Sequence, residues 1–485
     1  MPDVEPRLSD REVDLIAARL AERLGAAPRE RSTTVTESPP LPRLGEGVFV
    51  TIDEAVEAAA LAFRSLEGST LEKRGAIVAS IRESMVESAE DLARHAHRET
   101  GLGRAEDKLV KNLLVARKTS GPEVLTPQAV TGDNGLTLTE YAPYGVIGAI
   151  TPTTNPNATI ICNTIAMVSA GNSVVFNVHP NARECSMANI RLLNRAIVRA
   201  GGPANLVCCV SNPTIESAQK LMRHRGVRLL AVTGGAGVVR EAMTSGKRAI
   251  CAGPGNPPVV VDATADLELA GRQVVAGGSF DNNIVCTDEK EVIAVDSIVD
   301  DLLRQMERAG AYLLDAAELR RVERVIFTEN RGPGRSSIVN KDVLGKNAAV
   351  ILAAAGIEVR GNPRLAVARV ANDHPLVWTE QMMPVMPVTS VPDVDQAIEL
   401  AKEAEHGYGH SAGMYSRDIE ALSRMARVIN TSIFTKNGPF FAGLGEGGEG
   451  HTSFTIASPT GEGLTGPISF SRLRRCVLVD HFRIV

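Results

Sequence analysis

Residues 146–176 read VIGAITPTTNPNATIICNTIAMVSAGNSVVF, and this stretch decides the fold. The apolar run 146–150 predicts a buried strand, and the proline-broken loop after it predicts a turn. Residues 158–169 are apolar over a helical length, and the run 173–176 predicts a second strand. A strand, a helix and a second strand in this order form the repeating unit of a parallel sheet that carries helices on its faces.

The same alternation continues on both sides of this stretch. Further strands are predicted at 206–210 and 229–233. A helix at 182–200 follows the strand at 173–176, and helices at 214–223 and about 237–245 follow the two further strands. A second α/β block runs from 258 to about 433. Before the first strand, residues 51–97 form a helical stretch, more helix follows to about 118, and residues 136–141 alternate as a strand does. The sequence therefore predicts an α/β protein with a doubly wound parallel sheet.

Composition excludes several classes of function. The 485 residues are 44% hydrophobic and 22% charged, with a net charge of −5, so no general basic surface exists for nucleic acid or an anionic membrane. No apolar run approaches the roughly 20 residues of a membrane span. The seven cysteines form no C-x-x-C pair, which is typical of a reduced, cytosolic protein. We expect no metal site, because glycines interrupt the one histidine pair, His406 and His410, and no third ligand is evident.

The first 46 residues stand apart from the α/β units. Ser9 and Glu12 form a capping box, and an apolar stripe follows, so residues 1–25 are predicted to form an amphipathic helix. Residues 26–46 are rich in Pro, Ser, Thr and Glu, which is typical of a flexible linker. The helix either folds back on the body of the protein or docks on a partner.

Five motifs carry candidate chemistry, although each also has a purely structural explanation. Cys286 ends the motif SFDNNIVC (279–286), where the apolar residues before it are interpreted as a short strand. The others are TPTTNP (151–156), VTGGAGVVR (232–240), CAGPGNPPVVVD (251–262) and EQMMPV (380–385). A lone cysteine is more often a buried apolar residue than a nucleophile, and a glycine-rich turn between strand and helix often serves packing alone.

Taken in order, these motifs resemble the aldehyde dehydrogenase superfamily. PYGVIGAITP, NSVVF, VTGGAGVVR, AGPGNPPVVV, Cys286, EQMMPV and YGHSAGMYSRD match its sequential landmarks from about residue 47 to 485. TPTTNP, AGPGNPP and SFDNNIVC are similar to the CoA-acylating branch, the propionaldehyde and acetaldehyde dehydrogenases of bacterial microcompartments. The resemblance implies a Rossmann-type cofactor domain (47–253, with 128–142 as an oligomerisation strand), an α/β catalytic domain (254–455), and a return to the cofactor domain with an oligomerisation arm (456–485).

The resemblance also implies a covalent mechanism. The Cys286 thiolate attacks the aldehyde, and the resulting oxyanion is stabilised by the Cys286 backbone N–H and a side-chain amide. Thr154 occupies the position that holds this amide in hydrolytic relatives, whereas the asparagine stands next to it, at Asn155. Asn155 is therefore the favoured donor, with Thr154 as the alternative.

Four positions match the family's cofactor-binding residues. Thr233, Gly234 and Gly235 correspond to the turn beneath the nicotinamide cofactor, and Glu380 corresponds to the residue that holds the nicotinamide ribose. His179 replaces the lysine usually found near the adenosine ribose, so it contacts ribose or a CoA phosphate, or is an ordinary surface histidine. NAD is the favoured cofactor.

One departure from the family pattern concerns the fate of the acyl group. Cys251 occupies the position of the glutamate that activates water in hydrolytic aldehyde dehydrogenases. Without that carboxylate, water attack should slow by about 10²–10⁴-fold, and coenzyme A becomes the acceptor. The predicted reaction oxidises a short-chain aldehyde, propanal or acetaldehyde, to acyl-CoA. The alternatives are a hydrolytic enzyme that uses another base, and a non-catalytic scaffold.

The first segment resembles the encapsulation peptides of such enzymes. That resemblance implies a microcompartment shell protein as partner, bound through residues 8–25, and a location in the cytoplasm within a bacterial microcompartment. The family also implies a homodimer or homotetramer, for which the strands at 136–141 and 474–480 are plausible inter-subunit arms.

Overall fold

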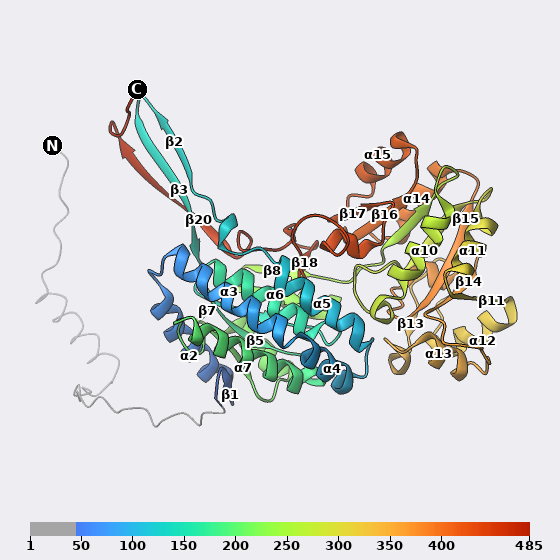
Figure 1. Cartoon of the computed structure of the whole chain (residues 1–485), viewed down its shortest axis with the longest axis horizontal. Coiled ribbons are helices and arrows are strands. Elements are labelled where there is room, and N and C mark those ends of the chain that lie inside the picture. Colours follow the sequence, from blue (N-terminus) through green and yellow to red (C-terminus); the bar gives the residue numbers. More distant parts are fainter. Residues whose placement is uncertain (1–44) are drawn as a thin grey trace, which may run out of the picture. The chain divides into compact units, whose positions relative to one another are not determined.

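A computed structural model describes residues 45–485 (Figure 1). The predicted helix at 1–25, and all of the predicted linker except its last two residues, lie outside the described residues.

The first α/β unit contains a six-stranded sheet in the order β1-β6-β5-β4-β7-β8. All neighbouring strands in it are parallel. Its strands are β1 (Val48–Phe49), β4 (Val146–Ile150), β5 (Ser173–Asn177), β6 (Val207–Val210), β7 (Val227–Thr233) and β8 (Ala249–Ala252). The strands predicted at 146–150, 173–176, 206–210 and 229–233 are β4 to β7, so the doubly wound parallel sheet is confirmed.

Helices cover both faces of this sheet. One apolar core joins the sheet to α3 (Leu71–Glu87), α5 (Ala105–Lys118), α6 (Pro156–Ser169) and α7 (Arg183–Arg199). A second core, on the opposite face, joins it to α2 (Ile52–Leu66), α8 (Ile215–Arg223) and α9 (Ala236–Met243). Every residue of α6 is buried, because it lies between the sheet and four other helices, α3, α4 (Ala89–Thr100), α5 and α7. That position explains why its sequence is apolar on all sides rather than on one stripe.

The helical stretch predicted at 51–97 is three helices rather than one. α2 ends at Leu66 and α3 begins at Leu71, with Gly68 at a φ of 85° between them. Thr70 then caps α3 by accepting a hydrogen bond from the Lys73 N–H. A further break at Ser88 separates α3 from α4 (Ala89–Thr100). The first break was readable in the sequence, because Gly68, Ser69 and Thr70 are stop and cap residues, whereas the residues around Ser88 keep a helical composition.

The second α/β unit contains a seven-stranded parallel sheet in the order β11-β14-β15-β10-β9-β16-β17. Its strands are β9 (Pro258–Val261), β10 (Glu291–Val295), β11 (Ala311–Leu314), β14 (Leu365–Arg369), β15 (Val385–Val391), β16 (Ser411–Tyr415) and β17 (Ile433–Lys436). The helices that cover it include α10 (Leu267–Gly278), α11 (Val299–Arg308), α12 (Ala316–Ile326), α13 (Ala348–Ala354), α14 (Val394–Ala404) and α15 (Ile419–Val428). The α/β block predicted from 258 to about 433 is therefore confirmed.

A three-stranded antiparallel arm is formed by segments far apart in the sequence. β3 (Gly135–Pro143) lies between β2 (Gln128–Gly132) and β20 (Ser471–Val479), as Figure 1 shows. β20 pairs with β3 along its whole length, from Ser471 opposite Pro143 to Val479 opposite Gly135. The two segments predicted as arms thus lie in one sheet.

Within residues 45–485, no helix is both long and apolar enough to cross a bilayer.

Candidate active site

A cavity of about 560 Å³ brings together every candidate site residue that the sequence indicates. It lies where β4, β5 and β7 end, and loops of the second α/β unit form its other wall. Carboxyl ends of parallel strands are the usual ligand site of α/β sheets. Its lining includes Cys286, Asn155, Thr154, Thr233, Gly234, Gly235, Glu380 and His179.

Cys286 lies in a turn, so the prediction that it ends a strand is wrong. A short 3-10 helix, η3 (Phe280–Asn283), precedes it, and the chain forms no ladder at Ile284 or Val285. Asp281, Asn282 and Asn283 all have positive φ, at 42°, 55° and 64°. Asp and Asn tolerate this conformation better than other side chains do, which explains the DNN sequence before the cysteine. Strained backbone of this kind persists only where surrounding contacts hold it.

Buried hydrogen bonds hold the two asparagines of this turn. The Asn282 side chain donates to the Gly345 carbonyl at 2.8 Å, and the Asn283 side chain donates to the Gly278 and Glu289 carbonyls at 2.9 and 2.8 Å. The fully buried Lys290 donates to the Asn283 carbonyl and side-chain oxygens and to the Val285 carbonyl. The turn that carries the sulfur is therefore fixed from several sides.

The resting thiol of Cys286 is protonated at neutral pH. Burial, and then the negative charge of Glu380, raise the pKa of Cys286 to about 12. Lys290 and the Cys286 backbone N–H act in the opposite direction and lower this pKa. An oxyanion on the carbon bonded to this sulfur would need a hydrogen-bond donor close by, and the Cys286 backbone N–H belongs to the same residue.

We expect alkylation of Cys286 by iodoacetamide to be slow at pH 7 and to rise about tenfold per pH unit up to at least pH 10. The thiolate is the reacting form, and its fraction rises with pH throughout the range below the raised pKa. The measurement is the second-order alkylation rate at each pH in the enzyme without cofactor, with Cys286→Ala giving the background from other thiols. A plateau in the rate near pH 7 would contradict the raised pKa.

Asn155 and Thr154 lie side by side on the cavity wall, at the N-terminus of α6. The Asn155 Oδ1 accepts a hydrogen bond from the Lys111 ammonium at 2.6 Å. Its Nδ2 donates to the Thr154 Oγ1 at 3.2 Å and has a second hydrogen to offer. Asn155 is buried, and its side chain does not cap the helix. An oxyanion near this point is also favoured by the positive end of α6.

Lys111 belongs to a buried charge cluster that composition did not reveal. Lys108 and Lys111, one turn apart on α5, both form ion pairs with the Asp281 carboxylate, at 3.0 Å for Lys108. All three side chains are buried, and burial lowers the pKa of Lys108 to about 8. The sequence contains the signal in EDKLVKN (106–112), but charged residues in a helix are usually solvated, and only the fold shows that these face inward.

The opposite wall of the cavity fits a nicotinamide dinucleotide. Gly235 caps α9, and a Cβ added there would meet no atom within 4 Å, so the turn is open to a ligand at Gly235, whereas a Cβ on Gly234 would overlap the Val238 side chain. The His179 Nδ1 accepts a hydrogen bond from the Asn181 N–H at 3.1 Å, and burial lowers the His179 pKa, so the neutral ring carries its proton on Nε2. A donor at the cavity wall suits a ribose hydroxyl or a phosphate.

Glu380 differs from every other lining residue in its charge. Among the described residues that line the cavity, it is the one carboxylate. Its Oε1 accepts a hydrogen bond from the Gly255 N–H at 3.4 Å, and burial raises its pKa.

The Cys251 side chain packs in the apolar core on the α2 face, and burial raises its pKa to about 11. Cys251 therefore offers neither a carboxylate nor a base to this site.

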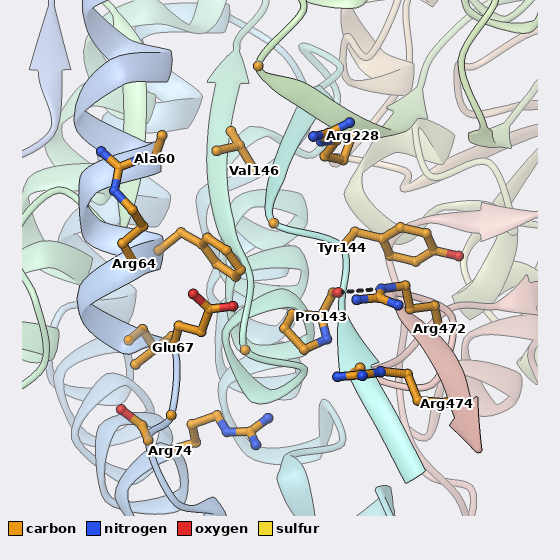
Figure 2. A pocket seen from close by; sticks show the side chains of 18 residues that line it. Ala60, Arg64, Glu67, Arg74, Pro143, Tyr144, Val146, Arg228, Arg472 and Arg474 are labelled. Carbon is orange, nitrogen blue, oxygen red and sulfur yellow. Dashed lines mark hydrogen bonds between the residues drawn. The ribbon is translucent and has the colours of Figure 1, made fainter. Parts of the chain in front are cut away.

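A second cavity, of about 550 Å³, lies at the base of the arm and away from these residues (Figure 2). Five arginines and one carboxylate line it: Arg64, Arg74, Arg228, Arg472, Arg474 and Glu67. Arg472 donates to the Pro143 carbonyl and Arg74 donates to the Ser169 carbonyl. Val146, the first residue of β4, lines this cavity, and Ile150, the last residue of β4, lines the cavity with Cys286. The two cavities therefore lie at opposite ends of this strand.

The fold and the site define a class of enzyme. The sequence pattern of the aldehyde dehydrogenase family matches residues 45–319 and 360–457, which is well over half of the chain. The chain belongs to the aldehyde dehydrogenase family. Within that family it is 51% identical over 442 residues to the acetylating acetaldehyde dehydrogenase EutE of Escherichia coli strain K12, an alignment that covers 90% of this chain and 94% of the relative.

Solved structures place the likeness in the same branch. A propionaldehyde dehydrogenase of Rhodopseudomonas palustris, solved with bound CoA and an acylated cysteine, is 47% identical, with a TM-score of 0.87 over 90% of this chain and 99% of that chain. A propionaldehyde dehydrogenase from the fucose utilisation microcompartment of Clostridium phytofermentans is 43% identical, with a TM-score of 0.88 over 91% of this chain and 100% of that chain. The predicted resemblance to CoA-acylating aldehyde dehydrogenases is confirmed.

Proposed function

We propose that this enzyme oxidises a short-chain aldehyde, propanal or acetaldehyde, to an acyl group on Cys286 and transfers it to coenzyme A. One observation carries the proposal. Cys286 lines the cavity, and Cys251, which stands at the position of the water-activating glutamate, packs in the apolar core and supplies no carboxylate. The relatives named above act on acetaldehyde and propionaldehyde, and one of them holds CoA beside an acylated cysteine.

The chain's own residues perform the first half of the reaction. The Cys286 thiol first gives up its proton to solvent. The thiolate sulfur then adds to the aldehyde carbon, and the carbonyl oxygen becomes an oxyanion between the Cys286 N–H and the Asn155 Nδ2. The nicotinamide dinucleotide, with NAD favoured, would be held by Thr233, Gly234, Gly235, Glu380 and His179. When bound, it supplies the acceptor for the hydride that the thiohemiacetal loses. An acyl thioester on Cys286 remains.

The second half depends on which nucleophile reaches the thioester. Cys251 cannot deprotonate water, so hydrolysis is slow, whereas the CoA thiol is an intrinsically better nucleophile toward a thioester. The CoA thiol loses its proton to solvent as its sulfur attacks the thioester carbon. Acyl-CoA forms, and Cys286 leaves as a thiolate that takes up a proton again. Residues 47–253 act as the cofactor domain and 254–455 as the catalytic domain.

Product analysis tests the proposal. With propanal, NAD and CoA, acyl-CoA and NADH should form in equal amounts, and omission of CoA should lower steady-state NADH formation by about 10²–10⁴-fold. Formation of propionate and NADH at an undiminished rate without CoA would instead establish the hydrolytic alternative, with Glu380 as the remaining candidate base. Comparison of acetaldehyde, propanal and butanal under the same conditions identifies the preferred chain length.

The arm supports self-association into a homodimer or homotetramer. Leu473, Val477 and Val479 on β20 are each more than half exposed, which is unusual for apolar residues on a sheet. The arginine-lined cavity adjoins the base of this strand, and arginine is enriched in protein interfaces. A partner subunit that covers the strand would bury both features.

We further propose that residues 8–25 bind a microcompartment shell protein. One structural relative comes from such a compartment, and the predicted apolar stripe of the segment suits a partner's groove. Deletion of residues 1–25 should leave activity unchanged and abolish co-purification with shell proteins. Ile16→Glu with Leu20→Glu should have the same effect in the full chain, and Glu22→Lys, off the stripe, should not. A truncated enzyme that still enters shells would show that the segment has another role.

A further inference from the structure

We infer that Lys111 is a positioning residue that fixes which end of the Asn155 amide faces the reacting aldehyde. The inference rests on the proposed role of Asn155 as oxyanion donor. An asparagine side chain presents an oxygen at one end and two N–H donors at the other, and only the donor end stabilises an oxyanion. If the amide rotated by half a turn, its oxygen would face the developing negative charge and repel it.

The contact with Lys111 removes this ambiguity. A lysine ammonium carries donors and no acceptor, so the Asn155 oxygen must be the atom that faces it at 2.6 Å. The Nδ2 atom then faces Thr154, and both residues line the cavity. Thr154 alone cannot set this orientation, because its hydroxyl both donates and accepts and would satisfy either end of the amide.

Asp281 holds the Lys111 ammonium in place and connects it to the nucleophile. Its carboxylate contacts both lysines, and its Oδ1 also accepts a hydrogen bond from the Arg104 N–H at 2.6 Å. A Cβ on Gly103 would overlap this carboxylate, so the Asp281 side chain can take this position only because residue 103 is a glycine. Asp281 belongs to the same strained turn as Cys286, five residues before it.

The two reacting parts of the site are thus joined through one buried contact chain. The oxyanion donor stands on α6 of the first α/β unit, and the nucleophile stands on the turn after α10. Lys111 on α5 contacts Asn155 on one side and, on the other, Asp281, which lies five residues before the nucleophile. This arrangement keeps the donor and the sulfur in a fixed relation.

Lys111→Met tests the inference against a matched variant. Single-turnover NADH formation from propanal and saturating NAD, without CoA, should fall about 100-fold, as for loss of one oxyanion donor. Lys108→Met should cause a smaller loss, since Lys108 shares the Asp281 carboxylate but bonds to the Thr154 backbone carbonyl rather than to Asn155. An equal loss in both variants would show that buried positive charge, rather than amide orientation, matters, and would overturn the inference.

Two further readouts separate positioning from a general structural effect. Alkylation of Cys286 by iodoacetamide forms no oxyanion, so its rate and pH profile in Lys111→Met should stay within about threefold of those of the unaltered enzyme. In an Asn155→Ala background, Lys111→Met should slow NADH formation by no more than about threefold, because the group it orients is already gone. Parallel loss of alkylation, or full additivity of the two substitutions, would contradict the inference.

The same set distinguishes failure of the inference from failure of the proposed function. If Asn155→Ala alone leaves single-turnover NADH formation unchanged, the oxyanion role of Asn155 is wrong. If Asn155→Ala slows it and Lys111→Met does not, only the positioning role is wrong. Should Lys111→Met not fold, the double variant Lys111→Met with Asp281→Asn removes both charges of the Lys111–Asp281 ion pair. Asparagine at 281 tolerates the positive φ of that position. The Asn155 oxygen still lacks its donor in this double variant.

Discussion

Cys286→Ala should lower aldehyde oxidation by on the order of 10⁶-fold, to the level of background, because the covalent route then no longer exists. The measurement is NADH formation with propanal, NAD and CoA. Of the seven cysteines, only Cys286 lines the cavity that holds the other candidate residues. Binding of NAD and CoA should persist, since neither depends on the sulfur.

Cys476→Ala is the matched control for this substitution. Cys476 lies on β20 of the arm and does not line the cavity, so its loss should leave the chemical step unchanged. Comparable activity in Cys286→Ala and the unaltered enzyme would contradict the covalent mechanism. Absence of turnover in both would support the non-catalytic scaffold.

Asn155→Ala should lower the rate of single-turnover NADH formation by about 10²–10³-fold, and Thr154→Ala by less than about tenfold. The Asn155 amide offers a donor that Lys111 orients toward the cavity, whereas the Thr154 hydroxyl accepts a hydrogen bond from that same amide. Loss of Thr154 therefore removes one neighbour of the donor but not the donor itself.

This pair of variants decides between the two candidates that the sequence left open. The affinity for NAD, measured by fluorescence titration, should be similar in both variants, so that a difference in rate reports the oxyanion and not the cofactor. A larger loss in Thr154→Ala than in Asn155→Ala would reverse the assignment.

The sequence predicted the parallel sheets because each strand and helix in them is encoded locally. Short apolar runs, such as 146–150, lie between helices with their own start signals, and no distant contact is needed to recognise them. The sheet order and the pairing of β3 with β20 are different. Both depend on contacts between separate segments, which lie more than 300 positions apart for β3 and β20, so only the folded chain shows them.

The candidate site was predictable where the chemistry depends on residue type and order. Cys286, Asn155 and Glu380 were identified through motifs, and the structure brings them to one cavity. The conformation around Cys286 was not predictable. An apolar pair before a cysteine is typical of a strand, whereas the three positive φ angles depend on tertiary contacts with Gly345 and Lys290.

Lys111 was missed for a related reason. A lysine in a helix is normally solvated, and its burial follows from the packing of α5 against α6.

The central claim is that the acyl group waits on Cys286 for coenzyme A. The most direct measurement is rapid mixing of the enzyme with NAD and propanal in the absence of CoA, followed by intact mass analysis. The account predicts a burst of one NADH per active site and a propionyl group on Cys286 that persists until CoA is added. Continued NADH formation at the full rate, with free propionate and no acylated protein, would contradict it.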